Sequence, residues 1–235
     1  MKLAESTIAA RLAAPAQEGF ALFHMEPPTH PAALTCRRTY IGAFWHIEAQ
    51  AERWLWPVAQ EAFDPGSIDA AQAQSFARNW KKRLYPADFR PTDEGFGFVP
   101  LQGHLCRQRS FQAMSPIQMI EAALTQTNLP LVASLHPKET YSGDEKRALE
   151  DLAQRNPRLK IYTGNSIEAL RACRFVITEN SGMAFEGYVL HKPAVLFADI
   201  DFHHIAGSVP RDGLAPAFAT LGQAPPFDAY LYWFL

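Results

Sequence analysis

The chain has 235 residues, which is enough for one large domain or two small ones. Its composition, 48% hydrophobic, 12% aromatic and 20% charged, is that of a folded globular protein and excludes a disordered or collagen-like chain. Because 22 basic side chains stand against 24 acidic ones, the net charge is −2 and no overall positive field exists to hold nucleic acid. We therefore expect no nucleic-acid partner, and we expect any anion site to be local.

The cysteines and the chain ends indicate a cytoplasmic protein. Cys36, Cys106 and Cys173 lie far apart without a C-x-x-C pair, so neither a disulfide framework nor a zinc site is predicted. An acid, Glu5, stands where a signal peptide needs an apolar core. The apolar end, residues 229–235, is shorter than the ~18 residues that cross a membrane. It remains suited to packing on a partner or on the surface of the inner membrane.

The first 90 residues show little strand pattern. Only residues 20–25 have the pattern of a strand, and the rest is mostly helical in character. Phe76, Trp80 and Leu84, for example, recur at helical spacing. One strand is too few for a second complete doubly wound domain, so we predict a reduced, mostly helical N-terminal part.

The boundary between the two parts is predicted near residue 90. The stretch 85–95 carries two prolines, two aspartates and a glycine, which is typical of a connecting segment. We therefore predict an N-terminal region over residues 1–90 and a second domain over residues 91–235.

From about residue 96 onward, short apolar runs alternate with amphipathic helical runs. This alternation is typical of βαβ units, so we predict an α/β domain with an open, doubly wound parallel sheet. Capping residues mark the starts of four helices, at Ser115, Ser142, Asn165 and Ser181. The five predicted strands are Phe96 to Leu101, Leu131 to Leu135, Lys160 to Tyr162, Phe175 to Thr178 and Ala194 to Ala198.

Two loops at the carboxyl edge of this sheet are candidate binding sites, because ligands of open parallel sheets bind there. The first loop is His136-Pro137-Lys138, where an imidazole can bind phosphate or titrate and the proline restricts the backbone.

The second loop carries small polar residues and a glycine, Asn180-Ser181-Gly182, which can hold an anion near the backbone. Ordinary helix capping by Asn180 or Ser181 is the alternative. If His136 and Ser181 bind the same phosphate, we expect both to be surface-accessible. Glu186, about one turn into the following helix, is a candidate for holding a sugar hydroxyl.

Several other kinds of site are not indicated. The chain contains neither a complete dinucleotide fingerprint nor a P-loop, and no G-x-S-x-G elbow surrounds Ser181. His203 and His204 lie close to Asp199 and Asp201, but such a loop is more often simply polar, so we expect no metal and no cofactor.

The order of these motifs resembles the capsule polysaccharide biosynthesis family, which includes bacterial β-Kdo transferases and is similar to bacterial polysialyltransferases. The resemblance covers about residues 96–200, and its specificity lies in the order and spacing of short motifs. They are Phe98-Val99-Pro100-Leu101-Gln102, Ser115-Pro116, Leu135-His136-Pro137, Glu179-Asn180-Ser181-Gly182 with Glu186, and His191-Lys192-Pro193-Ala194-Val195.

The resemblance implies a GT-B glycosyltransferase fold whose Rossmann-like C-terminal domain binds a nucleotide-activated acidic sugar, with CMP as the expected nucleotide. His136 and Ser181, with Asn180 and Gly182 adjoining, would hold the nucleotide phosphate. The partners implied are the nucleotide sugar, a saccharide or glycolipid acceptor, and polysaccharide-assembly proteins.

One element of the family pattern is missing. Members supply an acidic base from an N-terminal domain, and this chain has only some 90 residues there. Asp93-Glu94-Gly95 has similar letters but directly precedes a predicted strand, so Glu26 is the substitute candidate for a catalytic role beside His136.

Two alternative functions remain open at this point. A UDP-sugar 2-epimerase of the same architecture has a similar serine-glycine loop and Lys-Pro turn. A truncated homologue without catalysis would act as a binding or assembly subunit, and the short N-terminal part favours this second alternative.

Overall fold

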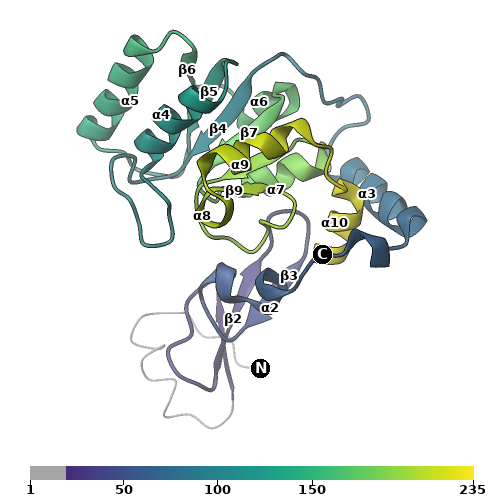
Figure 1. The fold of residues 1–235 in the computed structure, drawn as a ribbon. Helices are drawn as coiled ribbons and strands as arrows, with labels where there is room; N and C mark the ends of the chain where they lie inside the picture. The colour runs from purple at the N-terminus through teal and green to yellow at the C-terminus, as the bar shows by residue number, and fades with distance from the viewer. Residues whose placement is uncertain (1–19) are drawn as a thin grey trace. The chain divides into compact units, whose positions relative to one another are not determined.

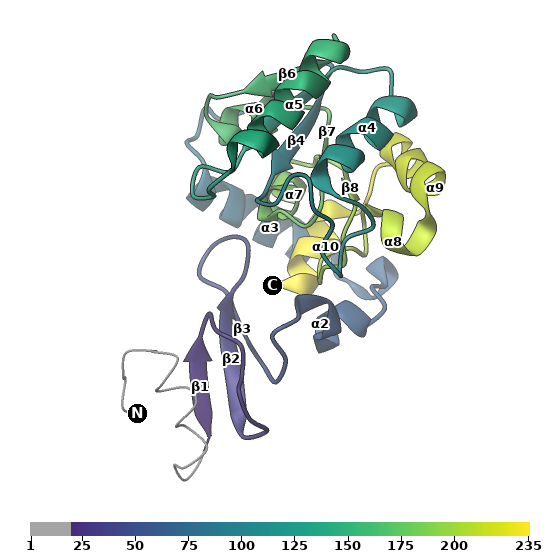
Figure 2. The same cartoon turned by 90° about the vertical axis from the view of Figure 1, so that its left-hand side faces the viewer.

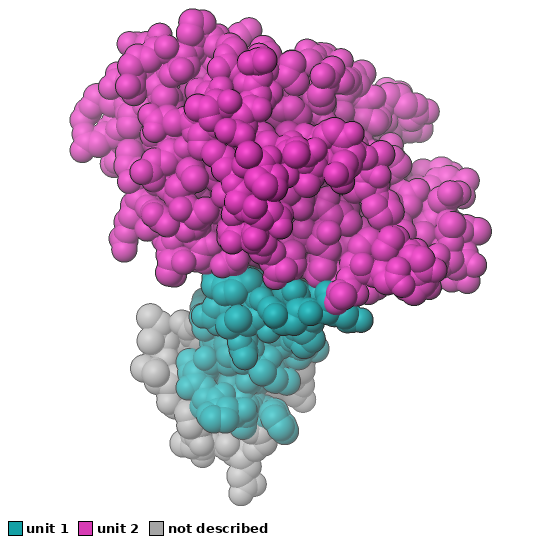
Figure 3. Space-filling view, viewed as in Figure 1, with its two compact units in different colours: residues 1–61 teal, residues 62–235 magenta. Residues whose placement is uncertain are grey.

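The computed structural model describes residues 20–235, which form two compact units, one ending at Glu61 and one running from Ala62 to Leu235 (Figure 3). The boundary predicted near residue 90 falls inside the second unit, because helix α3 (Ala70–Leu84) packs on the C-terminal helix α10 (Phe227–Phe234). The Tyr232 hydroxyl of α10 donates to Gln72 Oε1 of α3 at 2.8 Å.

The first unit is built on a three-stranded sheet. Strand β1 (Ala21–His24) runs parallel to β2 (Ala33–Arg38), and β3 (Trp45–Glu48) pairs antiparallel with β2. The strand predicted at residues 20–25 is confirmed, but the expectation of mostly helix is wrong for residues 20–61. Helical structure there is limited to single turns, η2 (Arg53–Leu55) and α2 (Pro57–Gln60).

Strands β2 and β3 were not predicted from the sequence. The run Ala-Leu-Thr-Cys-Arg-Arg in β2 has one β-branched residue, Thr35, and no aromatic residue, and β3 has the strand-favouring residues Trp45 and Ile47 but is only four residues long. It is the pairing between strands that buries Phe23, Ala33 and Thr35 together on one face. The sheet therefore depends on contacts that no local pattern reveals.

The second unit contains a six-stranded sheet in which all strands are parallel, in the order β6-β5-β4-β7-β8-β9 (Figures 1 and 2). The predicted open, doubly wound parallel sheet is confirmed, and all five predicted strands are present. The sixth was missed because it has only two residues. The strands are β4 (Gly97–Leu101), β5 (Leu131–Leu135), β6 (Leu159–Tyr162), β7 (Phe175–Thr178), β8 (Ala194–Leu196) and β9 (Gly207–Ser208).

Helices cover both faces of this sheet. On one face, α4 (Pro116–Gln126), α5 (Gly143–Arg155) and α9 (Leu214–Ala219) share a core with side chains such as Val99 of β4. The neighbouring Phe98 points to the opposite face, because successive side chains of a strand alternate. There α6 (Ser166–Ala172) and α7 (Gly182–Val189) pack on each other and on the sheet.

The four predicted helix caps are all present. Ser115 and Ser142 form capping boxes with Gln118 and Glu145, and the side chains of Asn165 and Ser181 accept from backbone N–H groups of their own helices. Residues 20–235 contain three further short helices, η3 (Pro65–Ser67), α8 (Val209–Asp212) and η4 (Thr220–Gly222). Among residues 20–235, no helix combines the length and the apolar character needed to cross a membrane.

The Lys192-Pro193 turn before β8 is stabilised by buried hydrogen bonds of Lys192. Lys192 is buried, and its ammonium donates to the carbonyl oxygens of Thr92 and Cys173, each at 2.5 Å. These bonds connect the segment that precedes β4 to the turn that precedes β7. The lysine of this family-like motif therefore has a structural role.

Candidate functional site at the switch point of the sheet

The sheet has a topological switch point between β4 and β7. From β4 the chain crosses over to β5 on one side, whereas from β7 it crosses over to β8 on the other side. The two strands therefore send their crossovers in opposite directions at the carboxyl edge, which is where ligands of doubly wound sheets bind. The loops that follow these strands are residues 102–115 after β4 and residues 179–181 after β7.

Backbone hydrogen bonds join the first of these loops to the end of β8. The Ala113 N–H donates to the Phe197 carbonyl at 2.7 Å, and the Asp199 N–H donates to the Phe111 carbonyl at 2.9 Å. Between them, Gln112 pairs with Ala198, whose own N–H donates to the Glu179 carbonyl at 3.2 Å. The loop after β4 is thereby held beside Glu179, the first residue after β7.

Glu179 is buried without a hydrogen-bond partner. Its side chain is 3% exposed, and neither carboxyl oxygen is hydrogen-bonded within residues 20–235. Burial raises the pKa of Glu179 to about 8, against a smaller lowering by the nearby positive charge of Arg109. The carboxyl group is therefore neutral at neutral pH and can donate as well as accept a hydrogen bond.

Arg109 and Gln112 bring further buried donors to the same place. Arg109 Nε and Nη2 and Gln112 Nε2 have no hydrogen-bond partner in the described part of the chain. The Arg109 guanidinium lies over the Phe111 ring, 4.8 Å from its centre. The backbone N–H of Arg109 donates to Gln112 Oε1 at 2.7 Å, which fixes the orientation of the Gln112 side-chain amide. Native proteins rarely leave several buried polar groups unpaired in one place, so these groups require an explanation such as a water, an ion or a ligand that pairs with them.

His136 follows β5, the strand next to β4, as predicted. Its backbone N–H donates to the Tyr141 hydroxyl at 3.0 Å, and its Nδ1 accepts from the Lys138 N–H at 3.2 Å. Because Nδ1 is an acceptor, the neutral ring carries its proton on Nε2, which is the nitrogen that can donate to a ligand. Pro137 and Lys138 are exposed, so the loop is open to solvent.

Ser181 is a helix cap and is not surface-accessible. Its hydroxyl oxygen accepts from the Met183 N–H at 3.3 Å and its side chain is 3% exposed, so the expectation of accessibility is wrong for this residue. Asn180 is half-buried beside it, and Gly182 is the first residue of α7. Capping an internal helix next to the sheet requires burial, which the sequence pattern did not reveal.

Glu186 and Glu26 have surroundings that the sequence did not indicate. Glu186 Oε1 accepts a hydrogen bond from the Tyr85 hydroxyl at 2.9 Å, and burial raises the pKa of Glu186. Its proposed contact with a sugar hydroxyl would therefore compete with Tyr85. Glu26 lies in the first unit, just after β1, and its catalytic role stays a prediction.

We expect Ser181→Ala to lower the free energy of unfolding by about 1 kcal/mol, because the first turn of α7 loses its cap. Asn165→Ala, which removes the cap of α6, is the matched control and is expected to cost a similar amount. Denaturant unfolding and nucleotide titration of both variants check this prediction. A loss of nucleotide affinity in Ser181→Ala alone would instead show a direct contact between Ser181 and the ligand.

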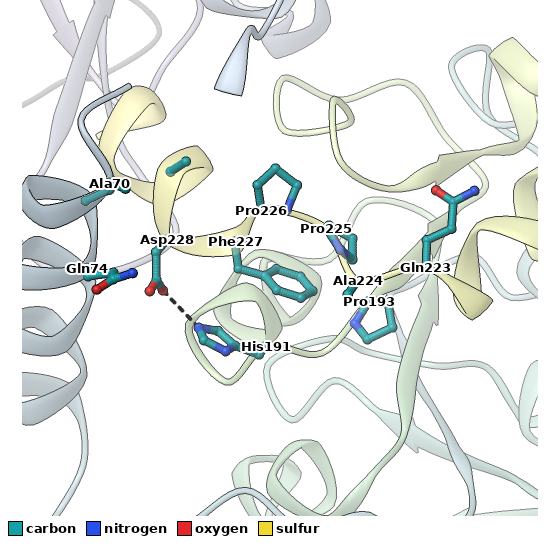
Figure 4. A pocket seen from close by; sticks show the side chains of 12 residues that line it. Ala70, Gln74, His191, Pro193, Gln223, Ala224, Pro225, Pro226, Phe227 and Asp228 are labelled. Carbon is teal, nitrogen blue, oxygen red and sulfur yellow. Dashed lines mark hydrogen bonds and ion pairs between the residues drawn. The ribbon is translucent and has the colours of Figure 1, made fainter. Parts of the chain in front are cut away.

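A hollow of about 480 Å³ lies away from the switch point (Figure 4). It is lined in part by His191 and Pro193, which precede β8, so it sits toward the amino ends of the strands. His191 Nε2 lies 2.9 Å from Asp228 Oδ1, and the His191 ring stacks on Phe227. We do not take this hollow as the functional site, because ligands of doubly wound sheets bind at the opposite edge, beyond the carboxyl ends of the strands.

Arg109, Gln112 and Glu179 received no role from the sequence. Arg109 and Gln112 lie in an irregular loop without a motif. Glu179 was part of the Glu179-Asn180-Ser181-Gly182 motif, but no role was assigned to it. Burial without a partner is what distinguishes these residues, and burial is a property of the folded chain. The position of Glu179 directly after a buried strand was the one available signal.

The second unit is thus a doubly wound α/β domain with buried polar residues at its switch point. The structure of the whole chain is similar to that of KpsC, a β-Kdo 2,7 transferase from Thermosulfurimonas dismutans, with a TM-score of 0.54 at 13% sequence identity. The alignment covers 92% of this chain and 79% of that one. No family model and no curated protein matches the sequence. The likeness establishes a distant structural relationship to a glycosyltransferase.

Proposed function

We propose that the protein is a glycosyltransferase of GT-B-like architecture that uses a nucleotide-activated acidic sugar, with CMP as the nucleotide, in capsule or cell-surface polysaccharide synthesis. The observation that carries this proposal is the switch point of the sheet, where His136 and several unpaired buried donors follow neighbouring strands at the carboxyl edge. The fold likeness to a β-Kdo transferase supports the same class of reaction. The acceptor would be a saccharide or a glycolipid, and any membrane contact would be peripheral.

In this proposal the nucleotide phosphate lies near the His136 loop and the amino end of α7. A departing nucleotide phosphate gains negative charge, and donors aimed at that charge stabilise the transition state. The His136 Nε2–H group and the Lys138 ammonium are such donors, and the dipole of α7 adds partial positive charge at its amino end. Glu26 is the candidate for the base that activates the acceptor.

Thermal-shift measurements test the choice of nucleotide. A ligand that binds only the folded state raises the melting temperature, so CMP and CMP-sialic acid should raise it more than UDP and UDP-N-acetylglucosamine do. The shift should persist in EDTA, since no divalent metal is proposed. Larger shifts with the uridine ligands would favour the 2-epimerase, and binding of CMP-sugar without turnover would favour a non-catalytic subunit.

We expect His136→Ala to weaken CMP binding by roughly 5- to 150-fold, which corresponds to the loss of about 1–3 kcal/mol from a charge-assisted hydrogen bond. The melting temperature of the unliganded protein should stay nearly unchanged, because the side chain lies in an open loop. His191→Ala, at the opposite edge of the sheet, is the matched control and should bind CMP normally. Isothermal titration measures both, and equal affinities in the two variants would contradict the proposed phosphate site.

A further inference from the structure

We propose that Arg109, Gln112 and Glu179 form a carboxylate-binding site at the switch point of the sheet, which recognises the acid group of the sugar that the nucleotide carries. This inference rests on the proposed function and adds to it the residues that select an acidic sugar. It assigns the sugar to the loops after β4 and β7 and leaves the nucleotide phosphate to the His136 loop.

The unpaired donors of Arg109 have the geometry that a carboxylate requires. Nε and Nη2 lie on the same edge of the planar guanidinium, so their N–H bonds point in parallel. Both are buried and unpartnered within residues 20–235. Two parallel N–H groups match the two oxygens of a carboxylate, and this bidentate pairing is favoured over single contacts. The Phe111 ring beneath the guanidinium holds its plane in place.

Gln112 adds a third donor whose direction is set by the backbone. Its Oε1 accepts the Arg109 N–H, so its Nε2 must be the unpaired end of the amide. The side chain is 4% exposed, and the residue is fixed by its bridge to Ala198. The amide is therefore a preorganised donor on the loop that carries Arg109.

Glu179 completes the site as a neutral partner. Burial keeps its carboxyl group protonated, so it can donate to a carboxylate oxygen of the ligand. An ionised Glu179 would instead repel an anion. With Glu179 neutral, the positive charge of Arg109 is balanced by the ligand, which explains why the protein places these groups together and leaves them unpaired.

The alternative is a direct ion pair between Arg109 and Glu179, with no role in binding. Arg109 acts electrostatically on Glu179, yet neither partner is hydrogen-bonded to the other. An ion pair would make both residues important for stability and neither important for the choice of ligand. The two readings therefore predict opposite results.

The test compares three ligands by isothermal titration: CMP, CMP-sialic acid, and the methyl ester of CMP-sialic acid, whose carboxylate is masked. The wild-type protein should bind the acid at least tenfold more tightly than the ester. Arg109→Gln should lose this preference and bind CMP within about twofold of wild type. Arg107→Gln, an exposed arginine of the same loop, is the matched control and should keep the preference. Glu179→Gln should keep it too, because an amide also donates.

Each other outcome overturns the inference. If the wild-type protein binds CMP-sialic acid and its methyl ester equally, the inference fails without any variant. The proposed function then stays intact if CMP still binds. If Arg109→Gln weakens the binding of CMP and of CMP-sialic acid equally, the Arg109 guanidinium binds the phosphate and not the sugar carboxylate. Lower melting temperatures of Arg109→Gln and Glu179→Gln with an unchanged preference would establish the ion pair. If the wild-type protein binds no CMP ligand, the proposed function fails together with this inference.

Discussion

Replacing Glu179 by glutamine is expected to leave stability nearly unchanged at pH 5 and to make the protein more stable than wild type at pH 9. Burial raises the pKa of the Glu179 carboxyl to about 8 in the folded protein, whereas its ordinary value is 4.5. Between these two values the folded state holds a proton that the unfolded state has lost. The free energy of unfolding of the wild-type protein therefore falls as the pH rises through this window, and glutamine removes the fall.

The expected difference is large. Within the window, each pH unit changes the free energy of unfolding by up to about 1.4 kcal/mol, so the total reaches several kcal/mol at pH 9. Urea unfolding of both proteins at pH 5, 7 and 9 measures it. Glu150→Gln, which removes an exposed carboxylate of α5, is the control and should follow the wild-type profile. Parallel profiles of Glu179→Gln and wild type would show that Glu179 is ionised and paired in the folded protein.

Gly207→Ala is expected to lower the free energy of unfolding by about 2–3 kcal/mol or more. Gly207 belongs to β9, and a methyl group there would meet the Ala217 carbonyl oxygen and lie 2.7 Å from the Ala217 carbonyl carbon. These are backbone atoms of α9, which cannot move away as a flexible side chain can. The helix would have to shift, and Phe218, which packs on Phe197, would shift with it.

Gly222→Ala is the matched control for this substitution. A methyl group at Gly222 meets no atom within 4 Å, so we expect a change within about 0.5 kcal/mol. Urea unfolding compares the two variants with wild type. A Gly207→Ala protein as stable as the control would mean that α9 does not pack closely on β9.

The structural neighbour places these predictions in context. The likeness to KpsC extends over 92% of the chain, although the first unit forms a small sheet and lacks the six parallel strands of the second. A base supplied from the first unit, such as Glu26, would have to be carried by this small sheet. The sugar and phosphate contacts proposed here all lie in the second unit, so its ligand binding can be tested in the whole chain without reference to Glu26.

The second unit could largely be predicted from the sequence, because its signals are local. Buried parallel strands such as Phe175–Thr178 are apolar on both faces, and the capping boxes at Ser115 and Ser142 are complete within four residues. The same locality explains why His136 was correctly placed at the end of a strand. Strands β2 and β3 are short, and their burial comes from pairing with each other and with β1, so local patterns did not reveal them.

The sequence by itself determined the α/β class, the five main strands and the position of the His136 and Ser181 loops at one edge of the sheet. Only the tertiary structure decided which polar side chains there are buried without partners. Arg109 reaches Glu179 because the loop after β4 pairs with the end of β8, and Ser181 is buried because α7 packs against the sheet. The physical reason is that strand and helix patterns depend on residues close in the sequence, whereas the solvation of a charged group depends on all the segments that pack around it in the folded chain.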